Sequence, residues 1–225
     1  MTMKLYADPV STTCRAVLLY LAEHPMDVEL VGVSLMAGEH QAPEFVRINP
    51  NKAVPVLVDG DFVLTEASAI LKYLADLNGG AGYPTELRKR ARVNQLMDWL
   101  NTGFYKDFGY GVVYCRTLPH MKYDSPQTEN DVVANACDRA AAWLHILDTH
   151  WLAGQAFLGG QEPSIADYLG AAYVSIGDWV DFDISAYPNV VRWLNAMRAR
   201  PSWSQVNGAW DGVTAYMRSQ ILQPA

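Results

Sequence analysis

The sequence has few cysteines, no excess of positive charge and no long apolar run, and each absence argues against a class of protein. Its cysteines, Cys14, Cys115 and Cys137, are odd in number and widely spaced, unlike a disulfide framework or a Cys-x-x-Cys zinc site. The formal net charge of −7 disfavours a general electrostatic grip on nucleic acid or on an anionic membrane. We therefore expect no nucleic-acid partner, no membrane partner and no metal.

A leader segment and a membrane span are also missing from the pattern. Residues 1–6 run directly into a strand-like stretch, without the basic segment and apolar stretch of a signal peptide. No apolar run reaches the roughly 18 residues that a bilayer-spanning helix needs. Half of the residues are hydrophobic and 18% are charged, which is enough apolar material for a substantial core. We expect a cytoplasmic protein.

Strand and helix patterns alternate over residues 1–77. Strands are expected at 4–6, 27–33, 54–58 and 62–64, and helices at 14–23, 43–46 and 66–77. The turn residues Asp59-Gly60-Asp61 favour a hairpin between the last two strands. The resulting order β-α-β-α-β-β-α predicts a small mixed sheet covered by helices.

Residues 78–85 break this pattern with glycines and a proline, and we interpret them as a linker. Everything after them has helical spacing, so residues 86–225 are expected to form an all-helical domain. Helices are expected at 85–105 with a continuation to 114, at 132–152, from a Ser164–Asp167 capping box to about 180, from Pro188, from Pro201, and at 204–222, with a polar loop at 124–128.

Five motifs in chain order resemble those of the cytosolic glutathione transferases, in particular serine-type, theta- or delta-like bacterial members. They are the loop Tyr6–Arg15, the segment Gly38–Pro50, Val54–Pro55, the corner Thr65–Ile70 and Ser164–Asp167. The resemblance covers nearly the whole chain. It implies a thioredoxin-like glutathione-binding domain over 1–77 and a helical domain that contributes an electrophile pocket. It also implies a homodimeric glutathione S-transferase with glutathione as co-substrate and a hydrophobic electrophile as second substrate.

Ser11 is the residue for which the resemblance implies contact with the glutathione sulfur. The thiolate is the nucleophile, and lowering a thiol pKa by about two units from about 8.5 contributes roughly 2.7 kcal/mol. A serine hydroxyl is too weak a base to take the proton, but it can donate a hydrogen bond to the sulfur anion beside the positive end of a helix. Locally, Ser11, Thr12 and Thr13 all fit helix capping, and Thr12 is the nearest substitute for Ser11. Some classes of the family use a tyrosine, but Tyr6 lies within the expected strand, so we interpret it as a packing residue.

Ser11 and Cys14 have the spacing of a redox Cys-x-x-Cys motif whose first cysteine is replaced. A dithiol–disulfide cycle is therefore excluded, which disfavours a glutaredoxin-like oxidoreductase. Cys14 lies within the expected helix, where we interpret it as a small buried hydrophobe. Arg15 matches a common arginine of the family or is a solvated surface charge.

The resemblance implies that Val54 pairs with the cysteinyl part of glutathione like an added strand, next to a cis-proline at Pro55. An ordinary trans proline at the start of a strand is the alternative. His40, Asn51 and Lys52 match positions that bind the glycine carboxylate, although Lys52 also fits a solvated charge.

At the other end of the ligand, Glu66 is implied to pair with the γ-glutamyl ammonium. The backbone N–H groups of Ala67 and Ser68 would bind its carboxylate at a helix start. Relatives commonly have serine directly after the acid, so Ala67 lacks one hydroxyl donor. Either the Ser68 hydroxyl replaces this donor, or the affinity for glutathione is lower.

The electrophile pocket is expected where the helical domain faces Ser11. Its aromatic candidates, each of which also fits the core, are Tyr105, Phe108, Tyr110, Tyr114 and Trp210. Conjugation and glutathione-dependent dehalogenation are two forms of the same sulfur attack. The alternative function is a non-catalytic glutathione-binding or protein-assembly member of the same fold.

Overall fold

The computed structural model describes residues 2–221, which begin with a four-stranded mixed sheet. The strands are β1 (Met3–Ala7), β2 (Val28–Gly32), β3 (Val56–Asp59) and β4 (Phe62–Thr65). Their order is β2-β1-β3-β4, with β1 parallel to β2 and antiparallel to β3, and β3 antiparallel to β4. The intervening helices are α1 (Thr12–Glu23), the short 3-10 turn η1 (Glu39–Gln41), α2 (Pro43–Ile48) and α3 (Ala67–Leu77). The predicted order β-α-β-α-β-β-α is confirmed.

The strand that was expected at 54–58 begins two residues later. Pro55 has no N–H to donate to a ladder, and regular pairing with β1 starts where Val56 faces Tyr6. The Val54–Pro55 peptide itself is cis. The residues just before β3 therefore form a loop beside the start of α1.

The rest of the described chain is helical. Its elements are α4 (Leu87–Trp99), the π-helical segments η2 (Leu100–Phe104) and η3 (Lys106–Tyr114), α5 (Cys115–Thr117), η4 (Pro119–Met121), α6 (Pro126–Ile146), π-helical η5 (Leu147–Trp151), α7 (Ile165–Ser175), η6 (Ile176–Val180), α8 (Pro188–Arg198) and α9 (Pro201–Ile221). The α/β part followed by a helical part is as predicted. Residues 222–225 of the expected helical domain, with Leu222 at the expected end of the last helix, lie outside the described residues.

Two boundaries in the helical part were wrong for the same reason. The expected loop at 124–128 already contains the start of α6, because Ser125 caps the helix and Pro126 occupies its first turn. The helices expected from Pro201 and from residue 204 are one helix, α9. A proline in the first turn needs no hydrogen-bond acceptor, so it opens a helix rather than separating two.

The predicted capping box at the start of α7 is confirmed. The fully buried carboxylate of Asp167 accepts the N–H groups of Leu158 (2.6 Å), Gly159 (3.1 Å) and Ser164 (2.7 Å) and the Trp193 indole N–H (2.9 Å). It therefore ties the preceding loop and α8 to the start of α7.

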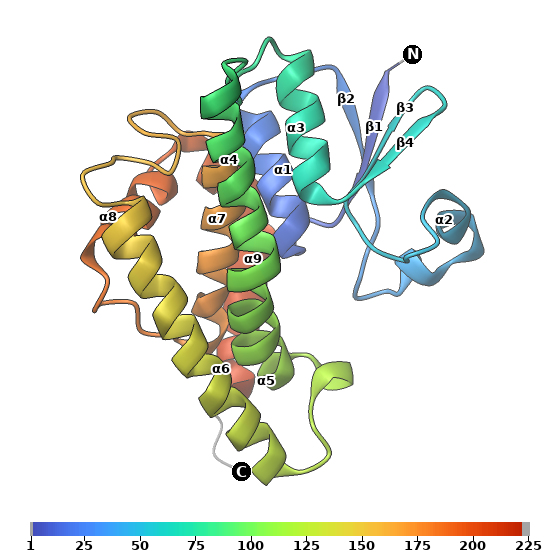
Figure 1. The fold of residues 1–225 in the computed structure, drawn as a ribbon. Helices are drawn as coiled ribbons and strands as arrows, with labels where there is room; N and C mark the ends of the chain where they lie inside the picture. Colours follow the sequence, from blue (N-terminus) through green and yellow to red (C-terminus); the bar gives the residue numbers. More distant parts are fainter. Residues whose placement is uncertain (1, 222–225) are drawn as a thin grey trace.

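Helix α1 is the element where the two parts meet. Figure 1 shows α1 and α3 between the sheet and the remaining helices, with α2 on the opposite side of the sheet. α1 packs against α3, α7 and α9, and one apolar core continues from the sheet into the helices. No helix within residues 2–221 combines the length and apolar character needed to cross a bilayer.

Candidate functional site

The loop between β1 and α1 is held in place by Asp8. Its carboxylate accepts the N–H groups of Val10 (3.0 Å) and Leu35 (2.7 Å), and its carbonyl accepts the Ser11 N–H (3.0 Å). Asp8 is buried, so these bonds fix the point at which Ser11 starts the helix. Sequence reasoning missed Asp8, although an Asp-Pro pair before a capping serine is a turn signal.

Ser11 is the N-cap of α1, where its half-buried hydroxyl oxygen lies 3.4 Å from the Cys14 N–H and 3.1 Å from the Thr13 hydroxyl. The Thr13 hydroxyl donates to the Val54 carbonyl at 3.2 Å. Because Thr13 has one hydroxyl proton and a carbonyl can only accept, Ser11 must be the donor in the Ser11–Thr13 pair. The Ser11 proton can therefore be redirected to an acceptor on a ligand.

The other thiol partners considered from sequence are engaged elsewhere. Thr12 is buried, and its hydroxyl lies 2.9 Å from that of Tyr114 on η3. Tyr6 packs edge-on against Phe45 of α2, with 6.2 Å between ring centroids. Burial raises the pKa of the Cys14 thiol to about 12, so this cysteine stays protonated at neutral pH.

The segment before Val54 is shaped by Asn49, a second residue that sequence reasoning did not single out. Its buried side chain donates to the Ala53 carbonyl (2.7 Å) and accepts the Asn51 N–H (3.0 Å). Lys52 follows with a positive φ of 55°, and Asn51 and Lys52 are both exposed. The tight turn thus presents these two side chains to solvent.

His40 lies on η1, after β2. Its Nε2 is 3.4 Å from the Gln41 side-chain nitrogen, and its Nδ1 is buried without a hydrogen-bond partner among residues 2–221. A buried polar nitrogen is normally satisfied. The ring is therefore able to take a polar partner from a ligand.

Glu66 occupies the corner between β4 and α3 with a strained backbone, at φ 70° and ψ 115°. Strained non-glycine residues of this kind concentrate at functional sites. Its side chain is exposed and makes no capping bond, while Ala67 is buried and Ser68 half-buried at the helix start. Burial raises the pKa of Tyr173, and the Glu66 charge contributes, so Glu66 lies within electrostatic range of the helical part.

Three of the aromatic candidates form one cluster on the π-helical segment. The hydroxyls of Tyr105 and Tyr114 are 2.5 Å apart, and the Tyr105 ring stacks on Tyr173 with centroids 3.9 Å apart. Tyr110 packs edge-on against both Tyr105 and Tyr114 and is 49% exposed. Through the Thr12–Tyr114 bond, this cluster adjoins the start of α1.

The structure places the other two candidates in the core. Phe108 has no exposed surface and packs between Phe104 and Phe182. Trp210 is 2% exposed, and its ring lies against the guanidinium of Arg15 (3.7 Å) and the ring of Trp179 (4.8 Å). Phe108 and Trp210 are therefore core residues and do not line an electrophile pocket.

Two family models match this chain. The one described as "Glutathione S-transferase, N-terminal domain" covers residues 1–76, and "Glutathione S-transferase, C-terminal domain" covers 113–201. The chain belongs to the glutathione S-transferase family. It is 33% identical over 207 residues to glutathione S-transferase D7 of Drosophila melanogaster, covering 90% of this chain and 88% of the relative. It is also 33% identical over 171 residues to human glutathione S-transferase theta-2B, covering 75% and 69%.

Solved structures of the family share the whole architecture. A delta-class glutathione transferase of Nilaparvata lugens has a TM-score of 0.81 at 30% identity and covers 96% of this chain and 99% of its own. Human glutathione-S-transferase T1-1 has a TM-score of 0.81 at 28% identity and covers 96% and 91%. The predicted thioredoxin-like domain with a helical domain is confirmed, as is the glutathione transferase function, and the non-catalytic alternative is not favoured.

Proposed function

We propose that this glutathione transferase is of the serine type, with the Ser11 hydroxyl donating a hydrogen bond to the thiolate of bound glutathione. The observation that carries this is the direction of the Ser11 proton. The Thr13 proton is directed at the Val54 carbonyl, so Ser11 offers a donor at the positive end of α1. Both features stabilise an anion and neither removes a proton, so the thiol proton leaves to solvent before sulfur attacks the electrophile.

The rest of glutathione would lie along the neighbouring loops. Val54, before the cis peptide to Pro55, would pair with the cysteinyl backbone in the manner of an added strand. The glycine carboxylate would bind His40, Asn51 and Lys52. The buried Nδ1 of His40 without a partner and the exposed side chains of the 51–52 turn support this placement.

The γ-glutamyl end would bind at the corner before α3. Glu66 would pair with the ammonium, and the N–H groups of Ala67 and Ser68 in the first turn of α3 would bind the carboxylate. The exposed, strained Glu66 supports this end of the site. Because Ala67 has no hydroxyl, this end has one donor fewer than a serine would give.

The electrophile would bind against the tyrosine cluster of Tyr105, Tyr110 and Tyr114. The half-exposed Tyr110 offers an apolar surface to solvent, and Tyr114 and the buried Tyr105 pack behind it next to the start of α1. Attack by sulfur on an electrophilic carbon with loss of a leaving group covers both conjugation and dehalogenation. We also propose a homodimer in the cytoplasm and a division of the chain into 1–77, a 78–85 linker and 86–225.

The test compares two serines that cap helices in the same way. Ser11 Oγ accepts from Cys14 N–H, and Ser125 Oγ accepts from Thr128 N–H, both at 3.4 Å. Ser11→Ala should raise the pKa of the bound glutathione thiol and lower kcat/KM for an aryl halide at neutral pH by about 10- to 100-fold. Ser125→Ala loses the same cap on α6 and should change neither value.

Ultraviolet absorbance of the thiolate as a function of pH measures the pKa directly. If Ser11→Ala matches Ser125→Ala, the Ser11 assignment is wrong and Thr12 or Tyr6 must be tested. If the thiol bound to the unmodified protein titrates like free glutathione, thiolate stabilisation as such is wrong.

A further inference from the structure

Arg15 is a buried charge one helical turn beyond Ser11. Its side chain has no exposed surface, and its backbone N–H donates to the Ser11 carbonyl at 2.9 Å. Helical side chains lean toward the N-terminus of their helix. The Arg15 side chain therefore starts in the first turn of α1, beside Ser11, and reaches Ser175 and Asn207 of the helical part.

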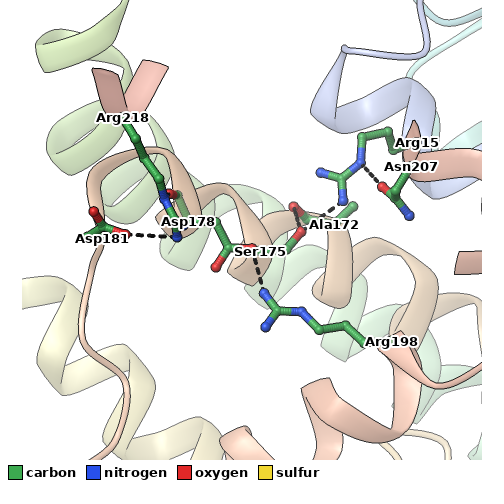
Figure 2. A network of polar contacts seen from close by, with 8 residues as sticks. All are labelled: Arg15, Ala172, Ser175, Asp178, Asp181, Arg198, Asn207 and Arg218. Atoms are coloured by element: carbon green, nitrogen blue, oxygen red, sulfur yellow. Dashed lines mark hydrogen bonds and ion pairs between the residues drawn. The ribbon is translucent and has the colours of Figure 1, made fainter. Parts of the chain in front are cut away.

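In the part of the chain that the structure describes, all the direct partners of this guanidinium are neutral. Its Nε donates to the Asn207 side-chain oxygen (2.5 Å), its Nη2 donates to the Ser175 hydroxyl (3.0 Å), and its Cζ lies 3.7 Å from the Trp210 ring centroid. Its Nη1 is buried without a hydrogen-bond partner among residues 2–221. Figure 2 shows the guanidinium between Asn207 and Ser175.

The acidic residues nearby do not neutralise Arg15. Asp178 pairs with Arg198 at 2.5 Å, and Asp211 is exposed on α9. Within residues 2–221, no carboxylate oxygen lies within 4.0 Å of the Arg15 guanidinium, whereas Arg198 and Arg218 each have one, as Figure 2 shows. Burial lowers the pKa of Arg15 to about 9, while the charges of Asp178 and Asp211 act to raise it and that of Arg198 to lower it, so Arg15 stays a cation at neutral pH.

A buried cation with only neutral partners is an unusual arrangement. Taking a guanidinium out of water is costly, and buried charges are normally paired. An ion pair would cancel most of the field of the cation, whereas hydroxyl and amide oxygens leave most of it in place. In a low-dielectric interior that field acts over several ångströms.

The field reaches the groups at the start of α1. The Tyr114 hydroxyl bonds the Thr12 hydroxyl at 2.9 Å, next in sequence to Ser11. Burial raises the pKa of Tyr114 to about 12, while the Thr12 and Tyr105 hydrogen bonds and the charge of Arg15 act in the opposite direction. A thiolate at Ser11 would experience the same cation.

We propose that Arg15 is a positioning residue for the transferase reaction, whose unpaired positive charge stabilises the glutathione thiolate from within the protein without touching it. This inference rests on the proposed thiolate site at Ser11. It predicts that the charge of Arg15, more than its shape, sets the acidity of the bound thiol.

The experiment changes the charge in two independent ways. Arg15→Met removes the cation, and Arg15→Lys keeps it on a different head group. Asn207→Asp leaves Arg15 in place and sets a carboxylate against its Nε, where the amide oxygen now lies at 2.5 Å. Asn135→Asp adds the same charge on the exposed face of α6 and is the matched control.

The pKa of the bound glutathione thiol is measured for each variant by thiolate absorbance, alongside glutathione affinity and unfolding by urea. Arg15→Met and Asn207→Asp should each raise this pKa by roughly one unit, the effect of a unit charge about 10 Å away at an effective dielectric constant of about 20. Arg15→Lys should recover most of the shift, and Asn135→Asp should cause none. A purely structural role would change stability while leaving the thiol pKa unchanged.

Asn207→Asp keeps the proposal testable if Arg15→Met does not fold. A wild-type thiol pKa that is depressed and unchanged by Asn207→Asp would overturn the role of Arg15 and leave Ser11 as proposed. A bound thiol that titrates like free glutathione in the unmodified protein would overturn both.

Discussion

The two ends of α1 are fastened to the helical domain by opposite chemistry. At the C-terminal end, the carboxylate of Glu23 accepts two hydrogen bonds from the Arg200 guanidinium, at 2.9 and 2.6 Å, and one from the Ser202 hydroxyl. At the N-terminal end, Thr12 and Arg15 bond only to hydroxyls and an amide. One end is a compensated ion pair, and the other holds a buried cation that no carboxylate among the described residues pairs with.

The contacts at the C-terminal end of α1 serve stability, and those at its N-terminal end serve the proposed thiolate site. The bidentate Glu23–Arg200 pair has a net charge of zero and little field beyond its own contacts, so its effect is to dock α1. Arg15 gains less from its neutral partners than a paired arginine would, and its burial opposes folding. The end that carries Ser11 is therefore the end where charge is left uncompensated, in agreement with the role proposed for Arg15.

The largest expected effect on the free energy of unfolding comes from removing the Arg15–Asn207 hydrogen bond at the N-terminal end of α1. Asn207→Leu leaves the buried Arg15 Nε without an acceptor and the Trp203 carbonyl without its 2.8 Å donor. An unsatisfied buried charged donor is costly, so the free energy of unfolding in urea should fall by about 2–4 kcal/mol. Asn135→Leu removes an exposed asparagine from α6 and should change it by less than about 0.5 kcal/mol. Equal values for the two variants would mean that Arg15 does not depend on Asn207.

Removing the Glu23–Arg200 ion pair at the C-terminal end of α1 should have a smaller effect on the free energy of unfolding, and this effect should depend on pH. Glu23→Gln removes the charge from a part-buried ion pair and should lower the free energy of unfolding at neutral pH by about 1–2 kcal/mol. The Arg200 hydrogen bond holds the pKa of Glu23 below its ordinary value of 4.5. Its contribution is therefore present above pH 4.5 and is lost as the pH falls through the lower folded value.

Urea unfolding at neutral and at acidic pH tests this sign, since the difference between wild type and Glu23→Gln should shrink on acidification. Glu44→Gln is the matched control, because its ion pair with Arg47 is largely exposed on both sides. A Glu23→Gln difference that grows as the pH falls would contradict the assignment.

Features encoded by local patterns could be predicted from the sequence. Alternating apolar residues and the Asp59-Gly60-Asp61 turn indicate β3, β4 and their hairpin, and the Ser164–Asp167 spacing indicates the start of α7. These signals act over a few residues. Expected and observed boundaries therefore differ mainly where a proline is involved.

Contacts between distant segments could not be predicted in this way. Arg15 also fitted a solvated charge, but its acceptors lie 160 and 192 residues further along the chain, at Ser175 and Asn207, and it is fully buried. The sequence placed Tyr105 and Tyr114 in one aromatic set but gave no reason for their hydroxyls to meet, because regular α-helical geometry puts residues nine apart on opposite faces. The wider turns of η3 bring Tyr105 and Tyr114 to one face, where their hydroxyls meet.

The smallest effect is expected from the neutral bond between Thr12 and Tyr114. A double-mutant cycle of Thr12→Val and Tyr114→Phe should give a coupling of about 0.5–1 kcal/mol in the free energy of unfolding. The value is small because Tyr114 keeps its bond to Tyr105 when Thr12 is replaced.

Thr12→Val combined with Tyr187→Phe is the control pair, because the Tyr187 hydroxyl donates to Ala141 and should be additive with Thr12. Additivity in the Thr12–Tyr114 cycle would show that this bond does not fasten the start of α1. We expect this coupling energy to be smaller than the drop in the free energy of unfolding caused by Glu23→Gln. That result would show that the charged contact at the C-terminal end of α1 stabilises the protein more than the neutral contact at its N-terminal end. The ion pair would then dominate docking at one end, and at the other the hydroxyls would contribute little to stability beside Arg15, a charge that no carboxylate within residues 2–221 pairs with.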